Sequence, residues 1–581
     1  MKRIVFALAL GLGLGAVAGE RMKIWPEGRM PDAQPHQIAA MTDEKEKGKE
    51  PYLEWFDPPA KPNGTCMILI SGGSYECCCD VGLIREWNKR FTYIGCQCVN
   101  LVYRTPRPKG LEIWRTAWED GQRAVRVVRS EAAKRGFSPD RIGTMSMSAG
   151  SHLATLLATS SMTPAYEPVD DLDRETPCNI NWAITGAIAY GVDDGLTGPN
   201  QRNGQAIDAK LDKIFKFDAQ TAPMCMFHGS VDLYSPMSST LVYRELRKRK
   251  VPAELHLFAD RNHGFWGWND GKAESTAYDN WFERAHEFMV QMGFLGPLGK
   301  GVELMDRYAA DFHDKSKYAK ADLWPKGKMP YAQKHQCVPY LEWYVPSNLT
   351  TKAIQIIYSG GSYQGNDPYG FEVAPFRRYL NEKGMAVVTM KYRTPRPKGL
   401  AKHTTAWADL QRCIRLVRAE APSRGLDPNR IGIMGSSAGG HLTLMGATSS
   451  RSRAYWNVDK TDKIPCNVQW AVGIYPAYAL SDGAEKPNAK GGNEDDSRLV
   501  PEFAFDPDTC PMVFIHGDAD GWAAMNSVKA WEQMRSMRIQ CDLHTLATRN
   551  HCFQKNAVPG TGSYTWMDRI WEFMNHKQIN K

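Results

Sequence analysis

Beyond its first residues the sequence has no long apolar run and no cluster of like charge. Crossing a bilayer takes about 20 apolar residues, and no later segment reaches that length without charge or proline. The net charge is only +8 over 581 residues, and the lysines and arginines are scattered, so nothing indicates a nucleic-acid partner. With 43% apolar and 23% charged residues, the composition is typical of a globular protein.

The 14 cysteines lack a repeated spacing. The chain consists of two similar halves, described below, and only Cys178 and Cys466 occupy matching positions. A disulfide framework would have been copied with the fold, so we expect most cysteines to be buried thiols or to form incidental local bridges. The run Cys77 to Cys79 lacks the usual spacing of metal ligands, and a metal site there is a minor alternative.

The first 18 residues have the pattern of an export signal. Lys2 and Arg3 precede an uncharged apolar run, and small residues at Ala16 and Ala18 form a cleavage pattern. We therefore expect residues 1–18 to be a signal peptide and the mature chain to be periplasmic or secreted, without stable membrane insertion after signal removal. A retained membrane anchor is the alternative.

The chain is an internal duplication. The nine residues YRTPRPKGL occur at 103–111 and again at 392–400. SGGSY at 71–75 recurs at 359–363, and RNH at 261–263 recurs at 549–551. Each copy has the size of a whole domain rather than of a solenoid repeat. We predict a first domain at 19–300, a linker at 301–320 and a second domain at 321–581.

Short apolar runs alternate with longer amphipathic ones in each half. Residues 66–70 and 354–358 have the pattern of buried strands, and residues 430–434 that of a short strand. Residues 116–135 have the pattern of a helix ended by Gly136. This alternation predicts the α/β class, with a mostly parallel sheet covered by helices on both faces in each half. In such sheets, functional residues gather at the carboxyl ends of the strands.

A G-x-S-x-G motif around Ser437 follows a predicted strand and opens an apolar helix. Small flanking residues permit a sharp turn that exposes the serine hydroxyl. In the first half the corresponding serine is Ser148, but Ser146 replaces the first glycine of the motif. We expect that turn to be more strained than its counterpart.

A serine nucleophile needs a base, and the base needs an acid that orients it. Candidates for both follow each serine in loops after predicted strands, in the chain order serine, aspartate, histidine. Corresponding positions in the two halves are 288 or 289 residues apart. The predicted catalytic residues are Ser148, Asp232 and His263 in the first half, and Ser437, Asp520 and His551 in the second.

The SGGS loops follow the first core strand of each half, where glycine lets backbone N–H groups approach a negatively charged intermediate. A second donor is expected from the residue after each nucleophile. The predicted oxyanion-hole residues are Gly72, Gly73, Ser74 and Ala149, and Gly360, Gly361, Ser362 and Ala438. A plain glycine turn is the alternative interpretation.

With these motifs the chain resembles the α/β-hydrolase superfamily. Its SGGS loops stand where the HGGG loop of hormone-sensitive-lipase-like esterases stands, and its H-G-x-x-D and N-H-G-F motifs resemble exported acetyl-xylan-esterase and feruloyl-esterase-like carbohydrate esterases. The resemblance implies two tandem α/β-hydrolase domains that remove acyl groups, O-acetyl foremost, from plant polysaccharide such as xylan. The partner would be an acylated polysaccharide or oligosaccharide.

The resemblance leaves other functions open. An oligopeptidase-like serine peptidase shares these motifs but usually carries a propeller domain, and we find no blade repeats. One half could instead be a degenerate polysaccharide-binding domain. Trp266 and Trp268 near His263 could stack on sugar rings or simply pack.

The predicted mechanism has two consequences for measurement. It needs no cofactor and no metal, so chelators should leave the rate unchanged. Because the base must be a neutral imidazole, activity should fall below about pH 6 to 7.

Overall fold

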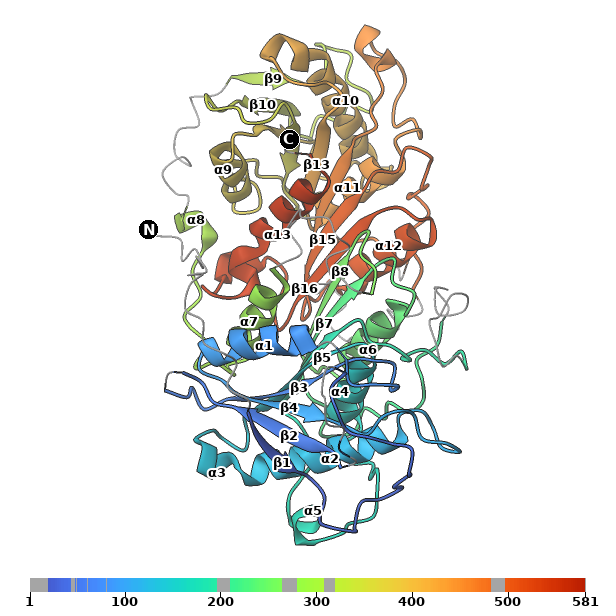
Figure 1. Ribbon diagram of the computed structural model, residues 1–581. Helices are drawn as coiled ribbons and strands as arrows, with labels where there is room; N and C mark the ends of the chain where they lie inside the picture. Colours follow the sequence, from blue (N-terminus) through green and yellow to red (C-terminus); the bar gives the residue numbers. More distant parts are fainter. Residues whose placement is uncertain are drawn as a thin grey trace.

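The computed structural model of the chain (Figure 1) describes residues 19–42, 48, 50–59, 61–79, 81–195, 209–263, 280–307, 319–481 and 497–579. The predicted export signal lies outside these ranges, as do Trp266 and Trp268. No helix within the described ranges has the length and apolar character needed to span a bilayer.

The two halves contain corresponding elements in the same order. The first half comprises β1 (Glu20–Lys23), β2 (Tyr52–Phe56), β3 (Cys66–Ile70), α1 (Val81–Tyr93), β4 (Gln97–Val102), α2 (Arg115–Ser130), α3 (Ala132–Arg135), β5 (Ile142–Met147), α4 (Ala149–Thr159), α5 (Asp171–Glu175), β6 (Trp182–Gly186), β7 (Met224–Gly229), α6 (Met237–Lys248), β8 (Ala253–Phe258), α7 (Trp281–Gln291) and α8 (Leu304–Arg307). The second comprises β9 (Lys320–Asp322), β10 (Tyr340–Tyr344), β11 (Ile354–Tyr358), α9 (Ala374–Glu382), β12 (Ala386–Lys391), α10 (Thr404–Glu420), η4 (Ala421–Arg424), β13 (Ile431–Ser436), α11 (Ala438–Thr448), η5 (Lys460–Lys463), β14 (Trp470–Ile474), β15 (Met512–Gly517), α12 (Met525–Ser536), β16 (Cys541–Leu546), η6 (Phe553–Asn556) and α13 (Gly562–His576).

Each half is built on a mostly parallel sheet. The strand order is β1-β2-β4-β3-β5-β6-β7-β8 in the first half and, equivalently, β9-β10-β12-β11-β13-β14-β15-β16 in the second. From β4 to β8 every pairing is parallel, while β1 and β2 add an antiparallel edge. Helices α1 and α7 cover one face, and α2, α4 and α6 the other (Figure 1). The predicted α/β-hydrolase architecture is confirmed.

Local sequence explains the main elements. All residues of β3 and β11 are buried, as expected of central parallel strands. The helix predicted at 116–135 forms as α2 and α3, and Gly136 ends it in the left-handed conformation, with φ 73°. Glycine adopts this conformation without the steric cost of a Cβ, so the predicted stop is confirmed.

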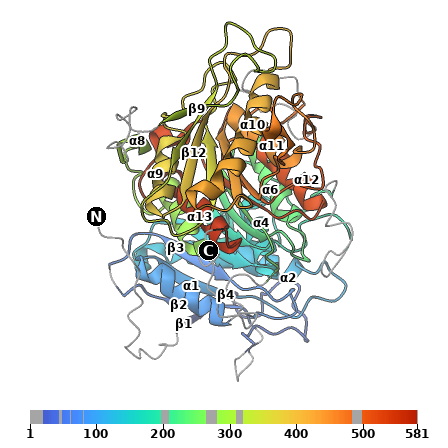
Figure 2. The same ribbon diagram turned by 90° about the horizontal axis from the view of Figure 1, so that it is seen from above.

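The two sheets are joined edge to edge into one sheet of 16 strands. Strand β8 pairs antiparallel with β16, with His256 opposite His544. Because equivalent strands pair in opposite directions, an approximate two-fold axis relates the halves. Helices α7 and α13 pack against each other beside this junction (Figure 1), and the view from above shows α13 where the two halves meet (Figure 2). The sequence had indicated tandem domains but not a shared sheet.

The predicted linker at 301–320 contains structure of its own. It includes α8, and Val302 exchanges backbone hydrogen bonds with Ala557 of the second half. Residues 308–318 lie outside the described ranges. The described part of this segment is therefore fixed to the second half.

All 14 cysteines lie in the described ranges, and all are free thiols, ten of them buried. Burial disfavours the thiolate and raises the pKa of Cys78 to about 12 and that of Cys96 to about 11. The expectation of buried thiols is confirmed, and no local disulfide joins any pair.

Candidate active site

The second candidate nucleophile lies at a sharp strand-to-helix turn. Ser437 lies between β13 and α11, with φ 55° and ψ −119°, a conformation that non-glycine residues rarely adopt. In the second half there is no room for a side chain at Gly435, because a Cβ there would lie 2.3 Å from the Gly439 carbonyl oxygen. The turn presents the serine at the carboxyl end of the sheet and at the amino end of a buried helix.

The first half forms the same turn without the first glycine. Ser148 has φ 57° and ψ −124°, close to the values of Ser437. The hydroxyl of Ser146 lies 3.1 Å from both the Ile184 carbonyl oxygen and the Ser151 hydroxyl. The expected extra strain at this turn is not observed, because its dihedral angles match those of the second half and the added hydroxyl is accommodated by polar partners.

The structure brings each predicted serine, histidine and aspartate together in one hydrogen-bonded chain. In the second half, His551 Nε2 lies 2.8 Å from Ser437 Oγ, and its Nδ1 lies 2.6 Å from Asp520 Oδ2. Because the Nδ1–H donates to the carboxylate, Nε2 is left to accept the serine proton.

The first half repeats this geometry. His263 Nε2 lies 2.8 Å from Ser148 Oγ, and its Nδ1 lies 2.8 Å from Asp232 Oδ2. Both aspartates are buried, whereas both histidines are partly exposed and so accessible to a substrate. The two groups therefore have the arrangement that activates a serine nucleophile.

The loops that contain Asp232 and Asp520, called the acid loops below, hold each aspartate ionised. The backbone N–H of Tyr234 donates to Asp232 Oδ1 over 2.8 Å, and Trp522 makes the same contact to Asp520. Burial alone would raise the pKa of Asp232, but hydrogen bonds from His228 and His263 outweigh it and lower the pKa to about 2. The same balance holds the pKa of Asp520 well below its usual range.

The SGGS loops contact the turns that carry the nucleophiles. Gly73 and Gly361 have φ 122° and 101°, and a Cβ on Gly361 would lie 2.4 Å from the Gly365 carbonyl oxygen. A Cβ on Gly150 would lie 2.4 Å from the Ser71 carbonyl oxygen, so helix α4 packs directly against the first loop. The loops therefore lie where oxyanion donors are needed.

One predicted oxyanion donor is wrong. The N–H of Gly360 donates to Glu372 Oε2 over 2.7 Å, so it is already engaged and does not face a substrate. The second-half donors that remain from the prediction are the backbone N–H groups of Gly361, Ser362 and Ala438. Sequence comparison of the halves could not reveal this contact, because Leu83 and Ile84 occupy the matching region of the first half.

The repeated nonapeptide supports these loops. Tyr103 donates its hydroxyl to the Ser71 carbonyl oxygen over 3.0 Å, and Arg107 Nε donates to that of Ser74 over 2.9 Å. Tyr392 and Arg396 make the same contacts in the second half. Since fixing the carbonyls fixes the peptide planes, these side chains orient the loop N–H groups.

The surroundings of the two histidines differ. In the second half the Tyr475 ring centre lies 4.6 Å from that of His551, and the Tyr475 hydroxyl donates to Glu372 and Gln554. The position matching Tyr475 in the first half is Ala187. In that half Tyr234 packs on His263 instead, with ring centres 4.6 Å apart. Sequence reasoning missed Glu372 and Tyr475, because neither is repeated between the halves.

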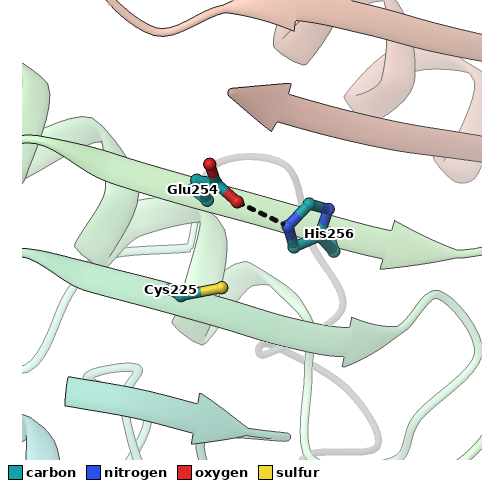
Figure 3. Close-up of side chains that lie close together, drawn as sticks. All are labelled: Cys225, Glu254 and His256. Atoms are coloured by element: carbon teal, nitrogen blue, oxygen red, sulfur yellow. Dashed lines mark hydrogen bonds and ion pairs between the residues drawn. The ribbon is translucent and has the colours of Figure 1, made fainter. Parts of the chain in front are cut away.

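Two groups of described side chains have the composition of a metal site, and the run Cys77 to Cys79 contributes to neither. In one group, Cys225 on β7 faces Glu254 and His256 on β8 (Figure 3). Their ligand atoms are largely engaged already. Glu254 accepts the Ala547 N–H over 3.0 Å and contacts His256 Nε2 at 3.1 Å, while His256 Nδ1 faces His544 Nδ1 at 3.0 Å. This group is therefore a hydrogen-bonded junction between the halves.

The family model of BD-FAE matches residues 55–194 and 341–533, more than half of the chain and part of each half. The chain belongs to the BD-FAE family. These matches include both candidate nucleophiles and both SGGS loops, and the resemblance to α/β-hydrolase carbohydrate esterases is confirmed.

Curated relatives match part of the chain. An acetylxylan esterase of Xylanibacter ruminicola is 33% identical over 225 residues, which are 36% of this chain and 42% of that protein. The endo-1,4-beta-xylanase B of Butyrivibrio fibrisolvens is 25% identical over 228 residues, 36% of this chain and 34% of that protein. The chain thus spans less than half the length of either relative.

Solved structures cover about half of this chain. An acetyl ester-xyloside bifunctional hydrolase of Caldicellulosiruptor lactoaceticus has a TM-score of 0.38 at 21% identity, over 48% of this chain and 100% of its own. A thermophilic esterase of Thermogutta terrifontis with bound propionate has a TM-score of 0.36 at 24% identity, over 47% of this chain and 98% of that esterase.

Proposed function

We propose that the chain is a serine esterase with a catalytic centre in each half, and that it removes acyl groups, O-acetyl foremost, from plant polysaccharide such as xylan. The observation that carries the proposal is the hydrogen-bonded serine, histidine and aspartate beside an SGGS loop in both halves. The names of the acetylxylan esterase and the xylanase among the relatives favour xylan as the polymer.

The proposed reaction has two steps. Ser437 Oγ attacks the ester carbonyl carbon as its proton passes to His551 Nε2, and the oxyanion is held by loop N–H groups. The carbon–oxygen bond to the sugar breaks, and the sugar oxygen takes the proton from His551. Water then hydrolyses the acyl-enzyme by the same route, releasing the carboxylic acid and free serine. Ser148 and His263 take these roles in the first half.

The test is acetate release from acetylated xylan, with a serine-reactive phosphonate as inhibitor. We expect Ser148→Ala and Ser437→Ala each to remove one phosphonate-labelled site, and the double variant to lose activity by at least about a thousandfold. Full activity in the double variant would refute the serine mechanism. Phosphonate labelling without acetate release would instead retain the hydrolase and redirect the search to feruloyl esters, other acyl sugars and peptides.

We further propose that the protein acts after export, in the periplasm or outside the cell. The basic residues and apolar run at 1–18 support this. The amino-terminal sequence of the protein recovered from its native compartment should begin near Gly19. A cytoplasmic protein that begins at Met1 would overturn this proposal and leave the esterase proposal intact.

A further inference from the structure

The second half contains a cluster of two histidines and a glutamate beside helix α11. His403 precedes the first residue of α10, His441 lies in α11, and Glu502 lies in the loop before β15. Glu502 Oε1 is 3.5 Å from His441 Nε2 and 3.7 Å from His403 Nδ1. All three ligand atoms lie within 4.8 Å of one another, although they come from three separate segments.

Two buried nitrogens in this cluster make no hydrogen bond within the described part of the chain. They are His441 Nε2 and His403 Nδ1, and both lie at ion-pair distance from the Glu502 carboxylate. The His441 side chain is fully buried. Its other nitrogen, Nδ1, is fixed by the Tyr363 hydroxyl over 2.8 Å, so the ring is held with Nε2 directed at Glu502. An unsatisfied polar atom in the interior is costly, and a ligand at Nε2 would remove that cost.

We propose that His403, His441 and Glu502 bind one divalent transition-metal ion, with zinc preferred. Zinc takes imidazole nitrogen and carboxylate oxygen at about 2.0 to 2.2 Å in a tetrahedron, which puts neighbouring ligand atoms about 3.3 to 3.6 Å apart. The distances of 3.5 and 3.7 Å from Glu502 Oε1 are close to that requirement. Calcium and magnesium prefer oxygen ligands, so the two imidazoles disfavour them.

The fourth ligand is water. The side chains of His403 and Glu502 are 17% and 22% exposed, so solvent reaches the edge of the cluster. One nearby charge opposes a cation, because Lys402 precedes His403 in the chain. Its ammonium lies 4.7 Å from the centre of the Tyr478 ring, which partly offsets that charge. Removing the Lys402 charge should therefore tighten metal binding.

The metal would stabilise the second nucleophile turn without entering the reaction. The N–H of His441 donates to the Ser437 carbonyl oxygen over 3.1 Å, one helical turn from the nucleophile. A metal at His441 would connect α11 to the start of α10 and to the loop before β15. This role agrees with a hydrolytic mechanism that needs no metal, and it predicts that chelation affects stability rather than the initial rate.

The first half offers an internal comparison. The positions matching His403, His441 and Glu502 are Trp114, His152 and Ile214. His152 resembles His441 in its other contacts: it has the hydrogen bond from a tyrosine, Tyr75, its ring centre lies 5.3 Å from that of Phe215, and its Nε2 makes no hydrogen bond within the described residues. Only one of the three ligands is present there, so we expect one metal ion per chain rather than two.

The experiment is zinc titration by calorimetry of the untagged full-length protein after chelator treatment and removal of the chelator. We expect one site per chain, and affinity weaker by on the order of a hundredfold in His403→Gln and Glu502→Gln. His152→Gln is the matched control and should bind as the wild type does. Lys402→Met should bind more tightly.

Cobalt substitution supplies a readout independent of activity. Tetrahedral cobalt bound to the wild-type protein should give an intense visible absorption band, and this band should be absent in Glu502→Gln. Zinc should also raise the thermal midpoint of the wild type but not that of His403→Gln. Absence of stoichiometric zinc binding by the wild type, or equal affinity in wild type and both ligand variants, would overturn the proposal.

Discussion

At the residue scale, Gly360 is a residue of the second site that has no room for a side chain. A Cβ there would lie 2.6 Å from both the Ser436 carbonyl oxygen and Ser437 Cβ. These are backbone and nucleophile atoms, which cannot move away without displacing the turn. The requirement for glycine at this position is therefore set by close approach to the nucleophile, not by donation of its N–H to the oxyanion.

We predict that Gly360→Ala, made in the Ser148→Ala background, lowers kcat of the second site on the order of a hundredfold, because small displacements of a nucleophile are costly. Steady-state kinetics on a chromogenic acetyl ester measure this. Gly365→Ala is the control, since a Cβ there meets no atom within 4 Å. Equal losses in both variants would show that the effect is not specific to the close approach.

At the element scale, the repeated nonapeptide supports the SGGS loop. Tyr392 donates to the carbonyl oxygens of Ser359 and Gly360, both over 3.0 Å. Its counterpart Tyr103 donates to Ser71. Both tyrosines are fully buried and do not reach a substrate, so they act by positioning the loop.

Tyr392→Phe should lower kcat of the second site about tenfold with little change in KM, since the loop loses the one hydroxyl proton that its two carbonyl oxygens share. The Ser148→Ala background isolates this site. In that background Tyr103→Phe should leave the rate unchanged, because it supports only the first loop. A rise in KM without a fall in kcat would indicate a role in substrate binding instead.

At the scale of the whole molecule, each acid loop is held by an arginine of the other half. Arg535 Nε donates to the Ser230 carbonyl oxygen over 3.1 Å, and Arg247 donates to the carbonyl oxygen of Asp518. Ser230 and Asp518 each lie two residues before the aspartate of their site. The two sites thus depend on the junction between the halves.

Arg247→Met should therefore lower the activity of the second site, although Arg247 belongs to the first half. We expect a fall in kcat of about tenfold in the Ser148→Ala background, from a loosened acid loop. Arg249→Met is the control, because Arg249 pairs with Glu245 on its own helix. An unchanged rate in Arg247→Met would mean that the second acid loop holds its shape without the other half.

The same junction makes stability depend on pH. Burial raises the pKa of Glu254 to about 8 and that of Asp542 to about 7, so the folded protein keeps protons that the unfolded chain loses above about pH 4. Their stabilising effect is complete below pH 4 and declines as the pH rises to about 8. Burial lowers the pKa of His256 and His544 well below its usual value, which opposes this trend only below about pH 6.5.

We therefore predict that the free energy of unfolding falls by about 2 kcal/mol between pH 6.5 and 8, measured by denaturant unfolding. Glu254→Gln should flatten this dependence, because an amide reproduces the hydrogen bonds of the protonated acid without titrating. A steep dependence that persists in Glu254→Gln and in Asp542→Asn would assign it to other groups.

The sequence by itself determined the two α/β halves and the order of serine, aspartate and histidine. It also predicted that these three residues meet within each half. These follow from local patterns: apolar strands, a glycine-rich turn after a strand, and polar loops at strand ends that a parallel sheet brings to one edge. Duplication strengthened the prediction, because the same residues recur about 288 positions apart.

Only the tertiary structure decided how the halves meet and which groups are engaged. The pairing of β8 with β16 depends on two sheet edges that lie far apart in the chain. The contact of Glu372 with the Gly360 N–H and the cluster of His403, His441 and Glu502 each join residues from different elements. Such contacts have no local sequence pattern, because packing of the whole chain sets the distances between their side chains.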